Sequence, residues 1–339
     1  MTTSALVLDN TSKTAMSRHP RIPALDFTKG ALVVLMVLYH WLNYFVGVDG
    51  VYYRYLRFIT PSFIFITGFF VSHIYCSKYA LTDTRLPKRL LQRGIKLIAI
   101  FLILNLAIRL LPGTSSVQLT DWSLYVMGGT THGKAAFSIL LPIGYLLVLS
   151  AILLPLSRFY SKIFGAVCLV LVMGILFASA WKLTSGYLEL ITIGLLGVNV
   201  GYVTMPRINE ILRHSYWVTA AYAGYLIAIT VWNEIFPLQI VGVCLSLALL
   251  YMLGNTSVEG NAIRNVVMLL GQYSLLGYIA QIAILKLLHW GLWRKISEEA
   301  MAGIALLLAM ALTMACVEAV HRGRASARFV DTLYRAVFA

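Results

Sequence analysis

The sequence predicts an all-α, polytopic integral membrane protein with about ten transmembrane helices, and three observations support this fold class. Of the 339 residues, 60% are hydrophobic and only 12% are charged, whereas a soluble domain has about 45–50% apolar and about 25% charged residues. The mean hydropathy is +0.81. Long apolar stretches alternate with short polar or helix-breaking segments. These features exclude a disordered chain, a collagen, a disulfide scaffold and an ordinary soluble enzyme.

Each transmembrane helix needs about 20 predominantly apolar residues, and ten stretches of roughly this length can be marked. The expected helices cover 29–48, 56–77, 92–111, 136–155, 163–181, 186–204, 216–233, 237–253, 266–288 and 301–320. Breakers lie between several of them, at Pro112–Gly113, Pro155, Pro206, Pro237 and Gly254–Asn255. The longest connection, 112–134, is rich in Gly, Ser and Thr. It is either a lid or partly re-entrant segment over a site, or a plain surface loop.

The distribution of Lys and Arg predicts the orientation of the chain. There are 27 Lys and Arg against 13 Asp and Glu, a net charge of +14. In a soluble protein this surplus would suggest a nucleic-acid partner. With the N-terminus in the cytoplasm, however, 19 of the 27 basic residues fall on the cytoplasmic side and 8 on the other side, as the positive-inside rule requires. We therefore expect cytoplasmic N- and C-termini and no nucleic-acid partner.

Three segments follow from this topology. Residues 1–23 form a cytoplasmic N-terminal tail that lacks the apolar core of a signal peptide. Residues 24–321 form the membrane-embedded domain, and 322–339 form a basic cytoplasmic C-terminal tail. The four cysteines lie in or at the ends of apolar stretches and lack the spacing of a zinc site. We therefore expect neither a bound metal nor a disulfide.

The first apolar stretch carries polar residues that are candidates for a functional site, because an ionisable group inside a membrane helix costs about 2.5–3.5 kcal/mol. Lys29 and His40 are eleven residues apart, which places them within about 20° of one helix face and about 16 Å apart along the axis. Asp26 lies one turn before Lys29, and Asn43 lies one turn after His40. A polar stripe therefore climbs from the cytoplasmic surface to mid-membrane, with Asp26 paired to Lys29 or to Arg21.

His40 has two interpretations. An imidazole is suited to proton transfer near neutral pH, so His40 is a candidate general base. Alternatively, it is hydrogen-bonded between helices for packing. In the second stretch, Arg57 either binds an acceptor or snorkels to the lipid headgroups. Thr67 and Gly68 of the same stretch allow close helix packing.

Two later segments are also informative. Six basic residues crowd the inner segment 78–96. The membrane topology and contact with anionic membrane lipids explain part of this cluster. The more specific interpretation is that these residues form a cytosolic binding site for a phosphorylated ligand. In the ninth stretch, Ser274, Tyr278 and Gln281 share one helix face. They either line a polar cavity or hydrogen-bond to neighbouring helices.

Together these segments resemble the transmembrane acyltransferase superfamily. The run Arg21…Asp26…Lys29-Gly30…His40 resembles its first helix, with an Arg/Lys-x10-His pattern. The run Pro61-Ser62-Phe63-Ile64-Phe65-Ile66-Thr67-Gly68 resembles the second-helix signature, in the form most similar to the heparan-α-glucosaminide N-acetyltransferase catalytic-domain family (acyltransferase family 3-like). Arg93-Gly94 and the later run from Gly271 to Gln281 agree with this. Lys29 departs from the pattern, because many members have Arg there, which adds a planar fork to the charge.

The resemblance implies transfer of an acyl group, usually acetyl, from cytosolic acyl-coenzyme A to a sugar, glycan or glycolipid. It implies that His40 acts as general base or acyl carrier, with Asn43, Ser274 or Tyr278 stabilising the oxyanion. The residues that would bind the coenzyme are Lys29, Arg89, Arg93, Ser274 and Tyr278. Arg57 would lie on the acceptor side. No metal is implied, and acyl-coenzyme A is the co-substrate.

A transporter or flippase for a glycan or lipid-linked substrate is the rival interpretation. The Lys29–His40 stripe has no counterpart in the second half of the chain, although transporters often carry inverted repeats. The expected location is the cytoplasmic (inner) membrane of a bacterium. The sequence leaves open the acceptor, the acyl chain, O- or N-transfer and the oligomeric state, a homo-oligomer included.

Overall fold

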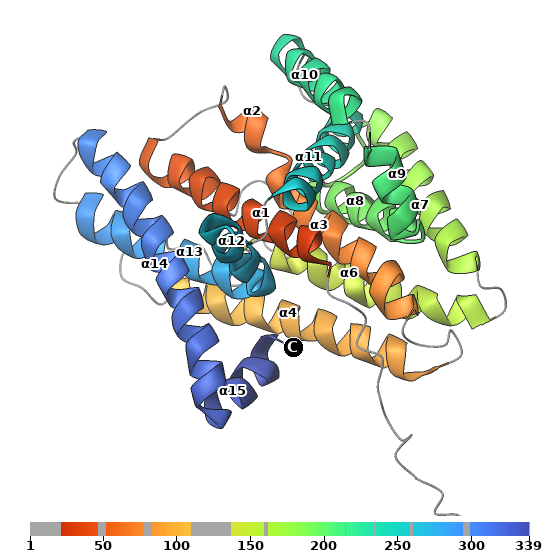
Figure 1. The fold of residues 1–339 in the computed structure, drawn as a ribbon. Helices are drawn as coiled ribbons and strands as arrows, with labels where there is room; N and C mark the ends of the chain where they lie inside the picture. The colour runs from red at the N-terminus through yellow and green to blue at the C-terminus, as the bar shows by residue number, and fades with distance from the viewer. Residues whose placement is uncertain are drawn as a thin grey trace, which may run out of the picture.

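The computed structural model describes residues 22–46, 52–77, 83–109, 137–158, 162–213, 215–232, 235–257, 260–293 and 299–338. All regular elements in these ranges are helical (Figure 1). The first half comprises α1 (Pro23–Trp41), η1 (Leu42–Val46), α2 (Tyr53–Leu56), α3 (Ile59–Phe70), η2 (Val71–Cys76), α4 (Arg85–Arg109), α6 (Leu140–Leu153), η3 (Leu154–Arg158) and α7 (Ile163–Ala180). The second half comprises α8 (Gly186–Val200), α9 (Met205–Leu212), α10 (Ser215–Val231), α11 (Phe236–Thr256), α12 (Ala262–Gln272), α13 (Ser274–Leu288), η4 (His289–Trp293), α14 (Glu299–Ser326) and α15 (Arg328–Phe338).

Seven helices in the described ranges are long and apolar enough to cross a membrane, or eight if the bent pair α8 and α9 is one span. Leu140–Leu156 and Ser215–Val231 are shorter apolar helices. Large apolar side chains such as Val170 and Phe177 of α7 are 70% and 69% exposed. Such a surface is typical of helices that face lipid. The all-helical, membrane-type fold class is therefore confirmed, and the count of ten spans stays a prediction.

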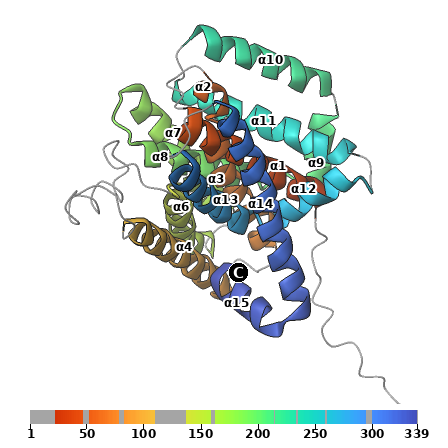
Figure 2. The same cartoon turned by 90° about the vertical axis from the view of Figure 1, so that its left-hand side faces the viewer.

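α1 lies at the centre of the bundle, in contact with α3, α11, α12, α13 and α14 (Figures 1 and 2). α4 pairs with α6, and α3 pairs with α8. The largest cluster of buried apolar residues includes Met36 of α1, Ile64 of α3, Leu146 of α6 and Ile193 of α8. The core thus joins the two motif-bearing helices, α1 and α3, to the middle of the chain.

Glycines of the motifs allow these helices to touch. A Cβ atom on Gly30 would collide with the backbone carbonyl of Val267, and one on Gly271 with the carbonyl of Asp26. α1 and α12 therefore cross with their backbones in contact. A Cβ atom on Gly68 would likewise collide with the carbonyl of Gly194 in α8. The packing interpretation of Gly68 is confirmed, since small residues are what close helix crossings require.

Local sequence explains where several helices begin and break. α1 begins with Pro23, whose missing N–H costs little in a first turn. Ser185 caps α8 by accepting a hydrogen bond from the Leu188 N–H. α8 and α9 meet at a bend of 103°. The expected stretch 266–288 is divided at Tyr273 into α12 and α13.

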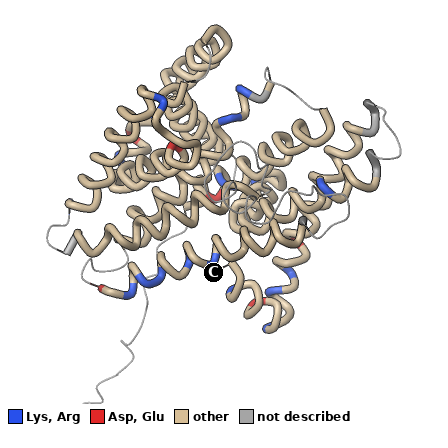
Figure 3. The backbone as a smooth tube through the Cα atoms, turned by 180° about the vertical axis from the view of Figure 1, so that it is seen from behind, with Lys and Arg blue, Asp and Glu red and all other residues tan. Residues whose placement is uncertain are grey.

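The long connection and the C-terminal segment have different outcomes. The segment 112–134, expected to be a lid or a loop, lies outside the described residues. Residues 322–339, expected as a tail, hold the end of α14 and the separate helix α15. Figure 3 shows Lys and Arg gathered along the start of α4 and around α15. In that view both groups lie along the lower side of the bundle.

Candidate functional site

A cavity of about 240 Å³ lies between α3, α4, α6, α13 and α15, and we name it the basic pocket. Most of its wall is apolar, as is usual for ligand pockets with a few polar groups. Its lining residues are Phe63, Thr67, Phe70, Tyr75, Arg93, Lys96, Leu97, Ile139, Leu140, Ile143, Leu147, Ser274, Leu275, Tyr278, Val337 and Phe338. The pocket thus joins the second-helix signature, the basic start of α4 and the late motif, which are distant in the sequence.

The cations of the basic pocket come from α4. The Arg93 guanidinium lies over the Tyr75 ring, 5.3 Å from its centroid, and is half-buried. Lys96, three residues later, is exposed and lines the same cavity. Arg89 lies one turn before Arg93 on α4, is exposed and does not line the pocket. Of the two predicted arginines, the structure therefore brings only Arg93 to this cavity.

The break between α12 and α13 supplies the opposite wall. Gly94 of the Arg93-Gly94 pair packs against Gly144, which draws α4 onto α6. Ser274 is the first residue of α13, and Tyr278 lies one turn further along the same face. Tyr278 is buried, and its hydroxyl oxygen accepts a hydrogen bond from the backbone N–H of Ile139. Both predicted residues of the ninth stretch therefore line the basic pocket.

His40 lies directly behind Tyr278. The two ring centroids are 6.3 Å apart, and the Tyr44 ring stacks on His40 at 6.2 Å. The Nε2 atom of His40 is buried and has no hydrogen-bond partner among the described residues. A satisfied packing histidine would have such a partner. This arrangement is what a site for a small polar ligand or water requires.

Gln281 presents a second set of unsatisfied polar atoms. It is fully buried, one turn after Tyr278 on α13, and neither amide atom has a partner within the described ranges. A buried amide without a partner costs free energy comparable to a lost hydrogen bond. His40 and Gln281 therefore offer an imidazole nitrogen and an amide group inside the bundle, on adjacent helices in contact.

Lys29 and Asp26 form the predicted ion pair, with Nζ and Oδ1 2.7 Å apart and side chains 17% and 16% exposed. The Lys29 ammonium also lies 5.2 Å from the centroid of the Phe70 ring, and Phe70 lines the basic pocket. Lys29 itself does not line the pocket. Arg21, the alternative partner of Asp26, lies outside the described residues.

Two predicted residues lie apart from these groups. Asn43 is exposed in η1, so it does not continue the face of His40. The expected spacing applies to an α-helix, and the chain changes to π-helical geometry at Leu42. Arg57 is exposed at the junction of α2 and α3, away from the basic pocket. Its neighbour Arg54 donates to the carbonyls of Ile229 and Thr230 at the end of α10.

The structure adds groups around His40 that the sequence did not suggest. Tyr44 of η1 contacts His289 of η4, with ring centroids 6.2 Å apart. Lys286 on α13 is close enough to His40 to interact with it electrostatically. Tyr44 and His289 meet because the two π-helical turns η1 and η4 pack together. The apolar sequence around them carries no signal for such turns.

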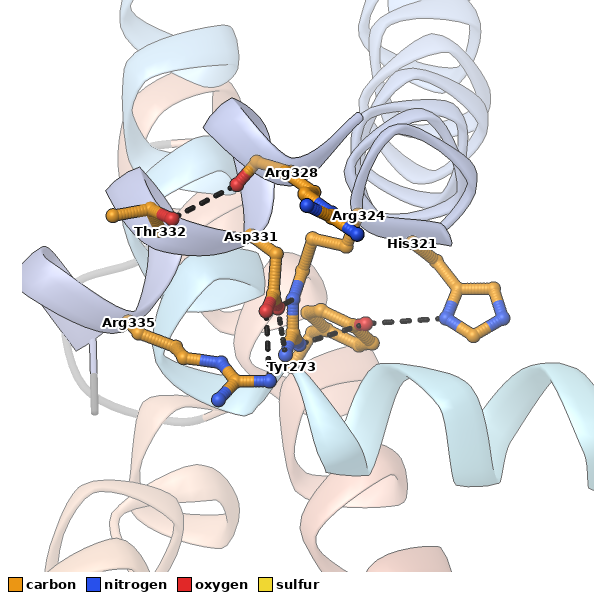
Figure 4. Close-up of polar contacts among 7 residues, drawn as sticks. All are labelled: Tyr273, His321, Arg324, Arg328, Asp331, Thr332 and Arg335. Carbon is orange, nitrogen blue, oxygen red and sulfur yellow. Dashed lines mark hydrogen bonds and ion pairs between the residues drawn. The ribbon is translucent and has the colours of Figure 1, made fainter. Parts of the chain in front are cut away.

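The helix α15 closes one side of the basic pocket through Val337 and Phe338. Figure 4 shows how it is held: the Asp331 carboxylate lies between two arginines, 2.8 Å from Arg324 and 2.7 Å from Arg335. The hydrogen bond from Arg324, followed by that from Arg335, lowers the pKa of the Asp331 carboxyl. The helix is therefore attached by charge as well as by apolar contact.

The same cluster joins α15 to the α12–α13 break. Arg324 donates to the Tyr273 hydroxyl at 3.0 Å, and that hydroxyl also bonds His321 Nδ1 at 3.1 Å (Figure 4). The Arg324 guanidinium lies 4.2 Å from the Tyr334 ring centroid. Because Tyr273 precedes Ser274, the attachment of α15 and the wall of the basic pocket share one turn of chain.

Within the described residues, no group of three or more His, Cys, Asp or Glu side chains could hold a metal ion. The polar atoms of the site are instead those of an imidazole, amides, hydroxyls and two cations.

Comparisons with protein-family models, with curated proteins and with solved structures found no match to this chain.

Proposed function

We propose that this protein is a membrane-embedded acyltransferase that moves an acyl group, usually acetyl, from cytosolic acyl-coenzyme A to a hydroxyl or amine of a sugar, glycan or glycolipid. One observation carries the proposal. Arg93, Ser274 and Tyr278 line one cavity, and the His40 ring, whose Nε2 atom has no partner among the described residues, lies 6.3 Å from the Tyr278 ring between centroids. Cations, a mainly apolar cavity and a buried imidazole near it are what transfer from a phosphorylated thioester requires.

The basic pocket is suited to the coenzyme. Arg93 and Lys96 attract the phosphates, because a guanidinium and an ammonium are the usual phosphate partners. The apolar wall, which includes Phe63 and Phe70, receives the uncharged arm. Lys29 lies near the pocket wall, 5.2 Å from the Phe70 centroid, with its charge largely balanced by Asp26, and Arg89 adds long-range attraction at the entrance.

His40 supplies the proton chemistry. In direct transfer, its Nε2 takes the proton of the acceptor O–H or N–H while the acceptor atom attacks the thioester carbonyl. The carbon–sulfur bond breaks, and the departing thiolate receives that proton. In the two-step form, Nε2 attacks the thioester carbonyl and the carbon–sulfur bond breaks, releasing the coenzyme as its thiolate. The acceptor atom then attacks the acyl group on Nε2, the acyl–nitrogen bond breaks, and the acceptor proton passes to the thiolate. Both forms use a nitrogen that is free of partners among the described residues.

The oxyanion of the intermediate requires a hydrogen-bond donor. The Tyr278 oxygen accepts a hydrogen bond from the backbone N–H of Ile139, so its O–H stays available as a donor, and both amide atoms of Gln281 are unpartnered within the described ranges. We assign the donor role to Gln281, because its whole buried amide lacks a partner, and keep Tyr278 as the second candidate donor. Asn43 is exposed, which supports a place for it on the acceptor path and not at the thioester.

The proposed topology has ten spans with both termini in the cytoplasm. The basic start of α4 and the cluster around α15 then face the cytosol, where the coenzyme is available. The acceptor approaches from the opposite end of α1, near Lys286, His289 and Arg57. A bacterial cytoplasmic membrane suits such an enzyme, which would modify glycans on the far side.

The test uses purified full-length protein, radiolabelled acetyl-coenzyme A and a panel of glycan and glycolipid acceptors. Label should move to one acceptor class, and His40→Ala should reduce transfer at least about 100-fold. Equal thermal unfolding of the two proteins controls for folding. Wild-type transfer by a folded His40→Ala protein would refute the assignment. Substrate flux across vesicles without coenzyme would support the transporter instead.

A further inference from the structure

Two cavities adjoin at the end of the bundle where α1 begins, α11 ends and α12 begins. We name them the polar chamber, about 350 Å³, and the apolar chamber, about 360 Å³. Both are lined by Met205 and Tyr251, so they share a wall. None of the residues lining the basic pocket lines either chamber.

The polar chamber offers one charge and several neutral groups. Arg264, in the first turn of α12, lines it, and the buried Nε atom of Arg264 has no partner among the described residues. Asn209 accepts a 2.8 Å hydrogen bond from the Tyr251 hydroxyl through its Oδ1 atom. This bond orients the Asn209 amide and leaves its N–H₂ group as a donor.

Charge complementarity favours an anion in this chamber. No Asp or Glu is among the described residues that line either chamber. The N-terminus of α1 also faces the polar chamber through Ile22, Pro23 and Ala24, and Ile22 provides no side-chain cap. A helix N-terminus favours negative charge, which adds to the field of Arg264.

The apolar chamber exists because α9 folds across the bundle. The 103° bend after α8 brings Met205, Ile208 and Leu212 over α1, α3 and α11. Its polar linings are satisfied, since Thr28 donates to the Ala24 carbonyl at 2.8 Å and Tyr251 to Asn209. A space with such walls holds hydrocarbon and not a second charged group.

We propose that the joined chambers bind one anionic phospholipid, with its phosphate at Arg264 and an acyl chain in the apolar chamber. A soluble phosphate would use the polar chamber alone, whereas a lipid uses both through their shared wall at Met205 and Tyr251. The helices of this protein are of membrane type, so the surrounding bilayer would supply a lipid to these chambers at high concentration.

The experiment measures retention and stabilisation by defined lipids. Full-length protein in detergent is titrated with phosphatidylglycerol, phosphatidylcholine or glycerol 3-phosphate, and bound lipid is counted by native mass spectrometry alongside thermal unfolding. One phosphatidylglycerol should bind with at least about tenfold preference over phosphatidylcholine. Glycerol 3-phosphate should stabilise the protein much less. Equal stabilisation by glycerol 3-phosphate would make this a soluble-phosphate site and overturn the proposal.

Variants separate the site from general surface charge. Arg264→Gln should weaken phosphatidylglycerol binding about tenfold or more, since a charge-assisted contact is lost. Arg213→Gln, an exposed arginine after α9, is the matched control and should change it less than about threefold. Arg264→Lys keeps the charge and should retain most of the binding. Unchanged lipid binding by Arg264→Gln, or an equal loss in Arg213→Gln, would overturn the assignment.

The apolar chamber has its own variant. Ala248 lines it from α11, and Ala248→Leu should reduce long-chain phosphatidylglycerol binding while Arg264 is intact. Binding of acyl-coenzyme A should be the same in all these variants, because the basic pocket is separate. Wild-type lipid binding by a folded Ala248→Leu protein would remove the acyl chain from this chamber and overturn that half of the proposal.

Discussion

The imidazole ring of His40 and the phenol ring of Tyr278 are 6.3 Å apart between centroids and inclined at 51°. Tyr278 lines the basic pocket, and His40 does not. The phenol therefore separates the imidazole from the cavity, and its oxygen accepts a hydrogen bond from the Ile139 backbone N–H. A ligand that reaches His40 from this pocket must pass the Tyr278 ring.

The first prediction concerns Tyr278 and Gln281. Tyr278→Phe should retain acyl transfer within about tenfold, because the unpartnered Gln281 amide remains as the oxyanion donor, and loss of the bond from the Ile139 N–H should cost about 1 kcal/mol of folding free energy. Gln281→Leu should reduce transfer about 100-fold or more, as expected for an oxyanion donor. The measurement is kcat with labelled acetyl-coenzyme A.

Stability distinguishes the two roles. Gln281→Leu replaces an unpartnered buried amide with an apolar group of similar size, so it should not lower the unfolding temperature. Tyr278→Phe should lower that temperature slightly. If Tyr278→Phe abolishes transfer while Gln281→Leu has no effect, the phenol is the donor and our assignment is wrong.

The second prediction compares two arginines of one helix. Arg93→Gln should weaken acyl-coenzyme A binding about tenfold or more, because Arg93 lines the basic pocket and is half-buried. Arg89→Gln should weaken it less than about threefold, since that side chain is exposed and screened by salt. Calorimetric titration at low and high salt measures both. Equal losses in the two variants would place the phosphates outside the pocket.

The third prediction concerns the Asp26–Lys29 pair. Lys29→Met leaves the Asp26 carboxylate without its 2.7 Å partner and should lower the free energy of unfolding by about 1–3 kcal/mol. The double variant Asp26→Asn with Lys29→Met should recover much of that loss. Coenzyme affinity should change less than about threefold, because Lys29 is paired with Asp26 and does not line the pocket. A larger loss of affinity in a stable Lys29→Met protein would show direct contact with the ligand.

The fourth prediction concerns α15. Its Asp331 carboxyl has a lowered pKa because Arg324 and then Arg335 donate hydrogen bonds to the charged form. Stabilisation by such a group is present above the ordinary carboxyl pKa of about 3.9 and is lost only as the pH falls through the lowered value. Hydrogen exchange of 328–338, corrected for intrinsic rates, should therefore be constant from pH 8 to pH 5. At pH 7, Asp331→Asn should raise it about tenfold.

Two variants control this result. Thr332 bonds only the Arg328 carbonyl of its own helix in Figure 4, so Thr332→Ala should leave exchange unchanged. His321→Gln removes the imidazole that contacts the Tyr273 hydroxyl, so any pH effect that remains belongs to the carboxylate. Unaltered exchange in Asp331→Asn would mean that the apolar contacts of Val337 and Phe338 hold α15 alone.

The sequence predicted the apolar helices well, because helices that face lipid need long runs of apolar residues, and such runs are visible in the sequence. Each expected stretch contains a helix in the described ranges. It did not predict the break at Tyr273, because the apolar run continues through that residue. It also did not predict the bend after α8, because only a few loop residues make that bend. α15 was missed as well, because its charges suggested a tail, although Phe329 and Leu333 alternate with them at helical spacing.

For the candidate site, periodicity along one helix placed Asp26 with Lys29 and Ser274 with Tyr278 correctly. It could not place Arg93 and Ser274 around one cavity, because that arrangement depends on how the helices pack in three dimensions. Asn43 was placed wrongly on the face of His40, since the π-helical turn at η1 has no sequence signature. Contacts within a helix follow from spacing, whereas contacts between helices depend on glycine crossings.

The last prediction tests such a crossing. Gly68→Ala should destabilise the protein by about 1–3 kcal/mol, because the new methyl group meets the backbone carbonyl of Gly194 and neither helix can retreat without opening the core around Ile64. Gly174→Ala is the matched control: nothing lies within 4 Å of its added Cβ atom. That change should stabilise α7 by up to about 1 kcal/mol, the helix propensity difference between alanine and glycine. Thermal unfolding in one detergent compares both, and equal unfolding temperatures would show that α3 and α8 do not pack through this glycine.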